Sequence, residues 1–94
     1  MHITIRFPEP SGPAGKLADA ELHFTDGPLA GLKLIGFGVW ERGDHVRRVT
    51  VPTRQYVANG ERRSFSLLRP AADGVSTESL QQEILDAYDR EVAR

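Results

Sequence analysis

Hydrophobic and polar residues alternate along five stretches of the chain, and this period of two predicts five β-strands. The pattern is clearest at the start, where Ile3, Ile5 and Phe7 fall on one side of an extended chain and the residues between them are polar. The β-branched and aromatic residues of the later stretches also favour strands over helices. The predicted strands are residues 2–7, 17–24, 29–41, 46–52 and 62–69.

Segments rich in turn-forming residues separate these strands. Residues 8–15 contain three prolines and two glycines, which predicts a surface loop. Arg42-Gly43-Asp44 predicts a tight turn between two paired strands. Asn59-Gly60 is the strongest hairpin signal in the chain, because both residue types tolerate a positive φ angle.

The stretch 29–41 is the most apolar, and it contains two glycines that would share a face of the strand with Leu34 and Trp40. Missing side chains at Gly36 and Gly38 would let a backbone segment or a helix approach closely. We therefore expect this stretch to be a central strand.

After Pro70 the hydrophobic period changes from 2 to 3.6, which predicts one helix that begins near Ser76 or Thr77 and continues to the end of the chain. Its outer face carries Glu83, Asp86 and Asp89, which makes this face unsuited to a phosphate backbone. The predicted fold is a single α+β domain over residues 1–94, in which one antiparallel sheet of about five strands packs against one C-terminal α-helix. The residues that we expect to be buried together are Leu34, Val49, Val51, Leu80, Ile84 and Tyr88.

The length of 94 residues is enough for only one hydrophobic core. No apolar run approaches the roughly 18 residues that a membrane-spanning helix needs, so the composition is that of a soluble globular protein. The chain contains no cysteine, which excludes disulfides, thiolate catalysis and zinc–cysteine sites. Because the first residues lack the pattern of a secretion signal, we expect a cytoplasmic location.

Charge is distributed unevenly, although the formal net charge is only −1. Residues 42–69 contain seven arginines against Asp44 and Glu61, a local charge of +5, and the rest of the chain therefore carries −6. This asymmetry is typical of a local anion-binding face, and arginines scattered over solvent-exposed strand faces would give the same count.

No combination of residues predicts an enzyme, a metal site or a cofactor site. His2, His23 and His45 are far apart and lack the spacing of metal ligands. The segment 12–16 (Gly-Pro-Ala-Gly-Lys) lacks the first glycine and the hydroxyl residue of a phosphate-binding loop. We expect no catalytic residue, no cofactor, no small-molecule substrate and no membrane partner.

The segment 51–63 contains a proline after an apolar strand, then a hydroxyl residue, Arg54, a short loop and Gly60-Glu61 followed by basic residues. This pattern resembles the stage V sporulation protein G (SpoVG-like) family. The first strand, the stretch 15–17, the residues 39–43 and the C-terminal helix with its late tyrosine are also similar to the corresponding parts of that family. The chain differs at Gln55, where a second basic residue is usual, and at Ser64, where an aspartate is usual.

The resemblance implies a small bacterial regulatory protein that binds DNA or RNA as a homodimer, with a twisted antiparallel sheet and a C-terminal helix. The arginines of the predicted hairpin would contact phosphates, because a guanidinium group can bind two phosphate oxygens at once. An alternative is a protein–protein adaptor that kept this fold and changed its partner, so that the basic patch would meet an acidic protein. The candidate nucleic-acid-binding residues are Arg54 and Arg63, with Arg47, Arg48 and Arg62 extending the patch.

Overall fold

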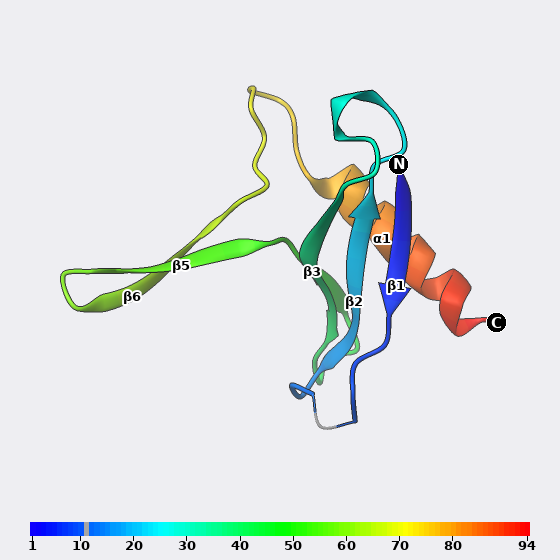
Figure 1. Ribbon diagram of the computed structural model, residues 1–94. Helices are drawn as coiled ribbons and strands as arrows, with labels where there is room; N and C mark the ends of the chain where they lie inside the picture. Colours follow the sequence, from blue (N-terminus) through cyan, green and yellow to red (C-terminus); the bar gives the residue numbers. More distant parts are fainter. Residues whose placement is uncertain (11) are drawn as a thin grey trace.

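The computed structural model describes residues 1–10 and 12–94 and contains six strands and one α-helix (Figure 1). The α+β class, with antiparallel strands and one C-terminal helix, is confirmed. The predicted loop over residues 8–15 connects the first two strands, and residue 11 of this loop lies outside the described residues. The elements are β1 (His2–Arg6), β2 (Lys16–His23), a short 3-10 turn (Gly27–Leu29), β3 (Lys33–Glu41), β4 (Arg47–Thr50), β5 (Thr53–Ala58), β6 (Glu61–Ser66) and α1 (Glu78–Val92).

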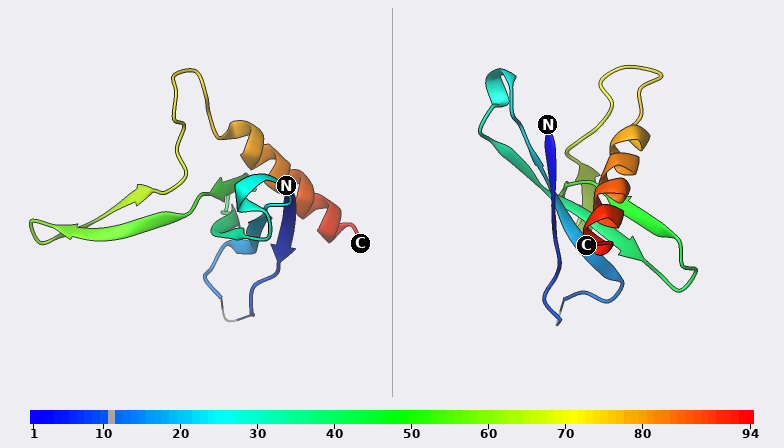
Figure 2. Two further views of the ribbon diagram at one scale, coloured as in Figure 1. Left: turned by 45° about the horizontal axis from the view of Figure 1, so that its top comes forward. Right: turned by 90° about the vertical axis from the view of Figure 1, so that its right-hand side faces the viewer.

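The first four strands form one antiparallel sheet in the order β1-β2-β3-β4, with β1 and β4 at its edges. The helix α1 packs across one face of this sheet, and the opposite face is left without a helix (Figure 2). We call this opposite face the open face. Strands β5 and β6 pair with each other in a separate two-stranded sheet.

The core lies between α1 and the two central strands. Alternate residues of β2, namely Ala18, Ala20 and Leu22, are almost completely buried, and the small alanines let the helix approach the sheet. Phe37 and Val39 of β3 fill the space next to them. The helix contributes Ile84, Ala87 and Tyr88.

The six residues that the sequence predicted to be buried together all lie in or against this core. Ile84 and Tyr88 are buried, and the other four residues are partly buried and pack against the core. The helix begins at Glu78 as the period predicted, with Thr77 at the N-cap position. The Thr77 hydroxyl accepts a hydrogen bond from the Gln81 side-chain amide at 2.9 Å and does not cap the backbone.

The two glycines of β3 do not face the helix, as the sequence allowed, but other parts of the chain. Gly36 has φ of +107° and lies in a β-bulge, where β3 has one residue more than β2 between the pairs Leu22–Leu34 and Ala20–Phe37. Gly38 leaves room for the indole of Trp40, which donates a hydrogen bond to the Thr50 hydroxyl at 3.0 Å. Both glycines therefore accommodate loop and side-chain atoms rather than α1.

The sequence pattern predicted no strand between residues 52 and 62, where the structure has β5. The predicted strand over residues 46–52 ends at Thr50, and Pro52, which has no N–H group, interrupts the pairing. A new strand begins at Thr53 and leaves the sheet, so the strands divide into a sheet of four and a hairpin of two. The two predicted turns at 42–44 and 59–60 are confirmed, and Asn59 and Gly60 have φ of 52° and 78°.

Candidate nucleic-acid interface

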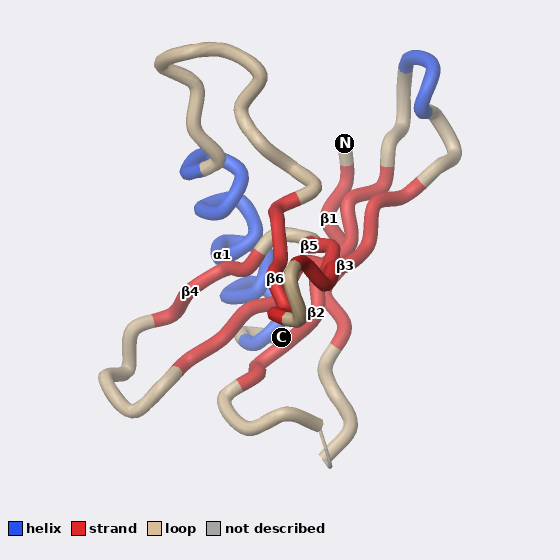
Figure 3. Tube along the Cα trace, turned by 90° about the vertical axis from the view of Figure 1, so that its left-hand side faces the viewer, coloured by secondary structure: helices blue, strands red, loops and turns tan. Residues whose placement is uncertain are grey.

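Strands β5 and β6, with the Asn59-Gly60 turn between them, form a hairpin that projects away from the rest of the molecule (Figure 1). We call residues 53–66 the arm, and the sheet of four with its helix the body. Figure 3 views the molecule from the side toward which the arm projects. Of the arm residues, only Ala58 and Ser66 are half-buried and the others are exposed, so both faces of the hairpin are available to a partner.

The register of the arm brings two arginines and two aromatic rings onto one face. Arg54 lies directly opposite Phe65, and Tyr56 lies directly opposite Arg63. The rings of Tyr56 and Phe65 are neighbours, with centroids 5.7 Å apart and planes tilted by 56°. Tyr56 remains 42% exposed and Phe65 39% exposed, so both rings are available to a ligand. We call Arg54, Tyr56, Arg63 and Phe65 the aromatic–arginine face.

The opposite face of the arm is different in character. Its side chains are mostly small or polar, and Val57, which is 70% exposed, faces Arg62 across the strand pair. Arg62, which the sequence grouped with Arg54 and Arg63, therefore points away from them.

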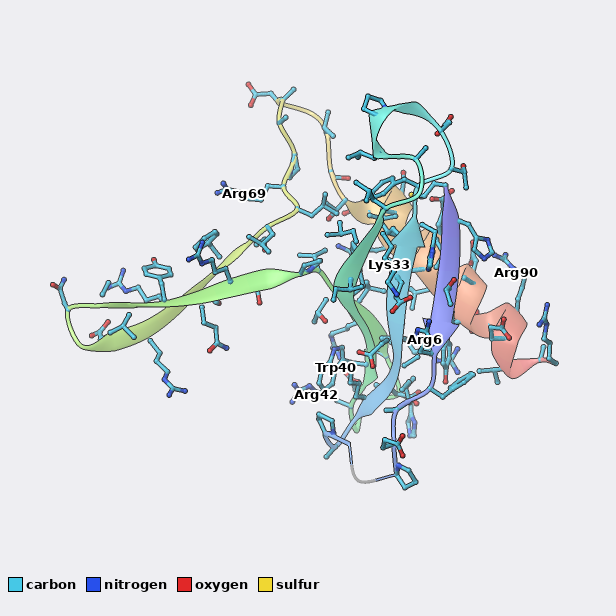
Figure 4. The ribbon with its side chains drawn as sticks, in the orientation of Figure 1. Arg6, Lys33, Trp40, Arg42, Arg69 and Arg90 are labelled. Atoms are coloured by element: carbon cyan, nitrogen blue, oxygen red, sulfur yellow. The ribbon has the colours of Figure 1, made fainter. Side chains whose placement is uncertain are left out.

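The arm and the segment that follows it carry an excess of positive charge. Residues 53–69 contain four arginines and one glutamate, a net charge of +3, so the rest of the chain carries −4. Within the described residues, Arg63 contacts Glu61 at 3.3 Å in an exposed pair, and Arg54, Arg62 and Arg69 form no ion pair. Figure 4 shows Arg69 directed away from the body next to the base of the arm. The guanidinium groups of Arg54, Arg62 and Arg69 are available to bind an anion, and Arg63 would bind one by leaving its exposed pair with Glu61.

Arg47 and Arg48 do not belong to this face, because both are on β4 in the body and each pairs with a carboxylate. Arg47 binds Asp89 of α1 and lies over the Tyr88 ring, 5.1 Å from its centroid. Arg48 binds Asp44 at 2.7 Å. This bond lowers the pKa of Asp44, together with the hydrogen bond from the Val46 amide, and raises the pKa of Arg48.

The structure therefore brings together only Arg54 and Arg63 of the five candidate arginines, and it adds Phe65, which the sequence analysis did not select. Phe65 could have been found by counting back from the Asn59-Gly60 turn, because a two-residue turn fixes which residues face each other. The short loop expected after Arg54 is part of β5, so Tyr56 lies within a strand.

A second group of charged residues lies on the open face, around Glu21 of β2. The Glu21 side chain is only 12% exposed and binds Arg6 at 3.1 Å, His23 at 3.3 Å and Lys33 at 3.4 Å. Burial opposes ionisation of Glu21, but the hydrogen bonds from Arg6, Lys33 and His23 outweigh it, so the pKa of Glu21 lies below its ordinary value. The cations here bind a carboxylate of the same chain, which makes this cluster a poor site for an external anion.

No family model, curated protein or solved structure matches this chain. The resemblance to the SpoVG-like family therefore stays a prediction. In the described part of the chain no helix is both long enough and apolar enough to cross a membrane. No three histidine or acidic side chains among residues 1–10 and 12–94 are grouped so that they could hold a metal ion.

Proposed function

We propose that this protein binds DNA or RNA through the aromatic–arginine face of the arm, as a small regulatory protein of the cytoplasm. One observation carries the proposal: two arginines alternate with two exposed aromatic rings on one face of a hairpin that the body does not cover. The resemblance of residues 51–63 to the SpoVG-like family supports the same function.

The chemistry of this face suits a nucleic acid. A guanidinium group can bind two phosphate oxygens and displaces condensed counterions when it does so. An exposed aromatic ring can stack on an unpaired base, whatever that base is. A two-stranded ribbon is also narrow enough to enter the major groove of a DNA duplex. The arm therefore offers both kinds of contact at once.

The same residues predict weak sequence preference. Contacts from arginine to phosphate position a protein on nucleic acid without reading the bases. The arm contains Gln55 and Asn59 as its only side-chain amides, and its remaining polar groups are short hydroxyls or charges. We expect binding to many sequences with similar affinity.

The negative charge of the body complements this arrangement. With +3 on residues 53–69 and −4 on the rest of the chain, an approaching polyanion is attracted to the arm and repelled by the body. The acidic residues on the outer face of α1 act in the same direction. This long-range field orients the protein so that the arm meets the ligand first.

Fluorescence anisotropy with labelled single-stranded and double-stranded oligonucleotides at about 50 mM salt tests the proposal, because phosphate contacts are strong at low salt. The decisive comparison is Arg54→Gln/Arg63→Gln against Arg47→Gln/Arg48→Gln. Each variant removes two arginines, the first pair from the arm and the second pair from the body. We expect the arm variant to lose most of its affinity and the body variant to keep it.

An acidic partner protein is the alternative that the same experiment addresses, because exposed tyrosine and arginine are also the residues of protein–protein hot spots. If the wild-type protein gives no anisotropy change with any oligonucleotide at this salt concentration, the nucleic-acid proposal is wrong and the adaptor hypothesis replaces it. Direct binding of labelled heparin then shows whether the arm still binds polyanions.

A further inference from the structure

The pairing of the arm continues for one residue beyond its two strands. The backbone N–H of Leu67 donates a hydrogen bond to the carbonyl oxygen of Pro52 at 2.8 Å, next to the last pair of the arm. Side chains alternate along a strand, so Leu67 lies on the side of the hairpin that carries Phe65 and Arg63. Leu67 is 56% exposed, so it belongs to the surface and not to the core.

Arg69 comes next in the same alternation. Leu68 turns inward and packs against the core, whereas Leu67 and Arg69 on either side of it are exposed. The Arg69 side chain points away from the body (Figure 4) and has no ion-pair partner among the described residues. No acidic residue lies between Glu61 and Asp73 in the sequence. Exposed side chains at alternate positions therefore form a row of four, namely Arg63, Phe65, Leu67 and Arg69, which we call the row.

We infer that the ligand of the arm is a single strand of DNA or RNA, which lies along the row, and that Arg69 binds a phosphate of this strand. The choice of a single strand rests on the proposed function, because it names the form of nucleic acid that the same face accepts. Arg54 and Arg63 bind phosphates within the arm, and Arg69 adds a third phosphate contact at its base.

The apolar side chains of this surface favour a single strand over a duplex. Bases are stacked on each other inside a duplex, so Tyr56 and Phe65 can stack only on bases that are unpaired. In the major groove this surface would meet the edges of base pairs, which are recognised mainly through hydrogen bonds. The side chains of Phe65 and Leu67 cannot form hydrogen bonds. Unpaired bases would instead cover the exposed apolar surface of both residues.

Charge alone would give the opposite preference. A duplex has a higher density of phosphates than a single strand, and it releases more counterions for each phosphate contact, about 0.9 against about 0.7. Three arginines that acted only through their charge would therefore bind a duplex at least as tightly as a single strand. Tighter binding of the single strand would report the contribution of the aromatic rings.

Anisotropy with two forms of one sequence tests the preference. A labelled strand of about 12 nucleotides and the duplex of the same sequence are titrated at about 50 mM salt. We expect the wild-type protein to bind the strand at least tenfold more tightly than the duplex. Tyr56→Leu/Phe65→Leu should lose most of this preference and still bind the duplex, because its arginines remain. A duplex that the wild-type protein binds as tightly as the strand would overturn the inference.

Arg69→Gln, compared with Arg42→Gln, tests the phosphate contact at the base of the arm. Both arginines are exposed and lie outside the strands, and Arg42 is in the turn between β3 and β4. For Arg69→Gln we expect severalfold weaker binding of the single strand, and a slope of log affinity against log salt concentration that is shallower by about 0.7. Arg42→Gln should leave both unchanged. The same slope in the two variants would overturn the role of Arg69.

A wrong proposed function and a wrong form of ligand give different results. If neither the strand nor the duplex changes the anisotropy, the proposed function is wrong and the single-strand inference falls with it. If both forms bind equally well through Arg54 and Arg63, and Arg69→Gln behaves like Arg42→Gln, only the inference is wrong. Equal urea midpoints of the wild-type protein and the two single variants show that the variants are folded.

Discussion

Pro52 packs against the main chain of Gly36, and this contact marks the point where the chain leaves the four-stranded sheet. Pro52 is buried, and a Cβ atom added to Gly36 would lie 3.1 Å from its Cβ atom. Gly36 also has φ of +107°, a backbone conformation that residues with side chains rarely adopt. The bulge at Gly36 and the ring of Pro52 together fix the position from which the arm departs.

Substitution of Gly36 tests this contact. We expect Gly36→Ala to lower the free energy of unfolding by about 1–3 kcal/mol, because the new side chain is strained at positive φ and crowds Pro52. Urea denaturation measures the change. Gly43→Ala is the matched control, since a Cβ atom at Gly43 would meet nothing within 4 Å, and its stability should be almost unchanged. Equal stability of the two variants would contradict the proposed role of the Gly36–Pro52 contact.

A prediction about the hydrophobic core concerns Ile84 of α1, which is completely buried against the sheet. Ile84→Ala should lower the free energy of unfolding by about 2–4 kcal/mol, because it removes two buried methyl groups and a methylene group and leaves a cavity. Val92→Ala on the same helix should cost less than about 0.5 kcal/mol, since Val92 is 53% exposed. An unchanged urea midpoint for Ile84→Ala would mean that this face of the helix does not pack on the sheet.

The lowered pKa of Glu21 predicts how the free energy of unfolding depends on pH. Its pKa is lower in the folded protein than its ordinary value of 4.5, so the folded state binds the proton less readily than the unfolded state does. The stability that Glu21 contributes is therefore fully present above pH 4.5 and is lost as the pH falls through the lowered value. Glu21→Gln has no such proton to gain, and its stability should fall less steeply on acidification.

Urea denaturation of both proteins at neutral pH and near pH 3 measures this difference. The variant keeps the other carboxylates, including Asp44, whose pKa is also lowered, so it should retain part of the acid sensitivity. An equally steep loss of stability in Glu21→Gln and wild type would show that the ion pairs of Glu21 with Arg6 and Lys33 do not persist in solution.

Variants of the two aromatic rings of the arm distinguish base stacking from phosphate contacts. Tyr56→Ala and Phe65→Ala should each weaken binding to single-stranded oligonucleotides by about 1–3 kcal/mol, because each removes a surface on which a base can stack. The dependence of affinity on salt should not change, since no phosphate contact is lost. Val57→Ala, on the opposite face of the arm, is the control. If it weakens binding as much as the aromatic variants, the wrong face has been assigned.

Local signals in the sequence predicted much of the fold. The period of 3.6 located α1, and the alternation of Ile3 and Ile5 located β1. The Asn59-Gly60 turn was also identified, because its residues have specific conformational preferences. These features depend on neighbours in the chain, which is why the sequence alone was sufficient.

The division of the strands could not be predicted in the same way. Whether β5 continues the sheet or leaves it depends on the packing of Pro52 against Gly36. Gly36 is on β3, and Pro52 lies between β4 and β5. The candidate site was affected similarly. Sequence proximity grouped Arg47 and Arg48 with the arm, but their positions on β4 bring them to Asp89 and Asp44 instead. The pair of Arg47 with Asp89 is a tertiary contact, which the local pattern does not encode, whereas Arg48 pairs with Asp44 across the turn before β4.

The salt dependence of binding tests the central claim most directly. For the wild-type protein the logarithm of the affinity should fall linearly with the logarithm of the salt concentration, by about 0.7–0.9 for each phosphate that is neutralised. Loss of two phosphate contacts in Arg54→Gln/Arg63→Gln should make this slope shallower by about 1.4–1.8 per arm. Arg47→Gln/Arg48→Gln should keep the wild-type slope, and equal changes in both variants, or no change in either, would contradict binding through the aromatic–arginine face.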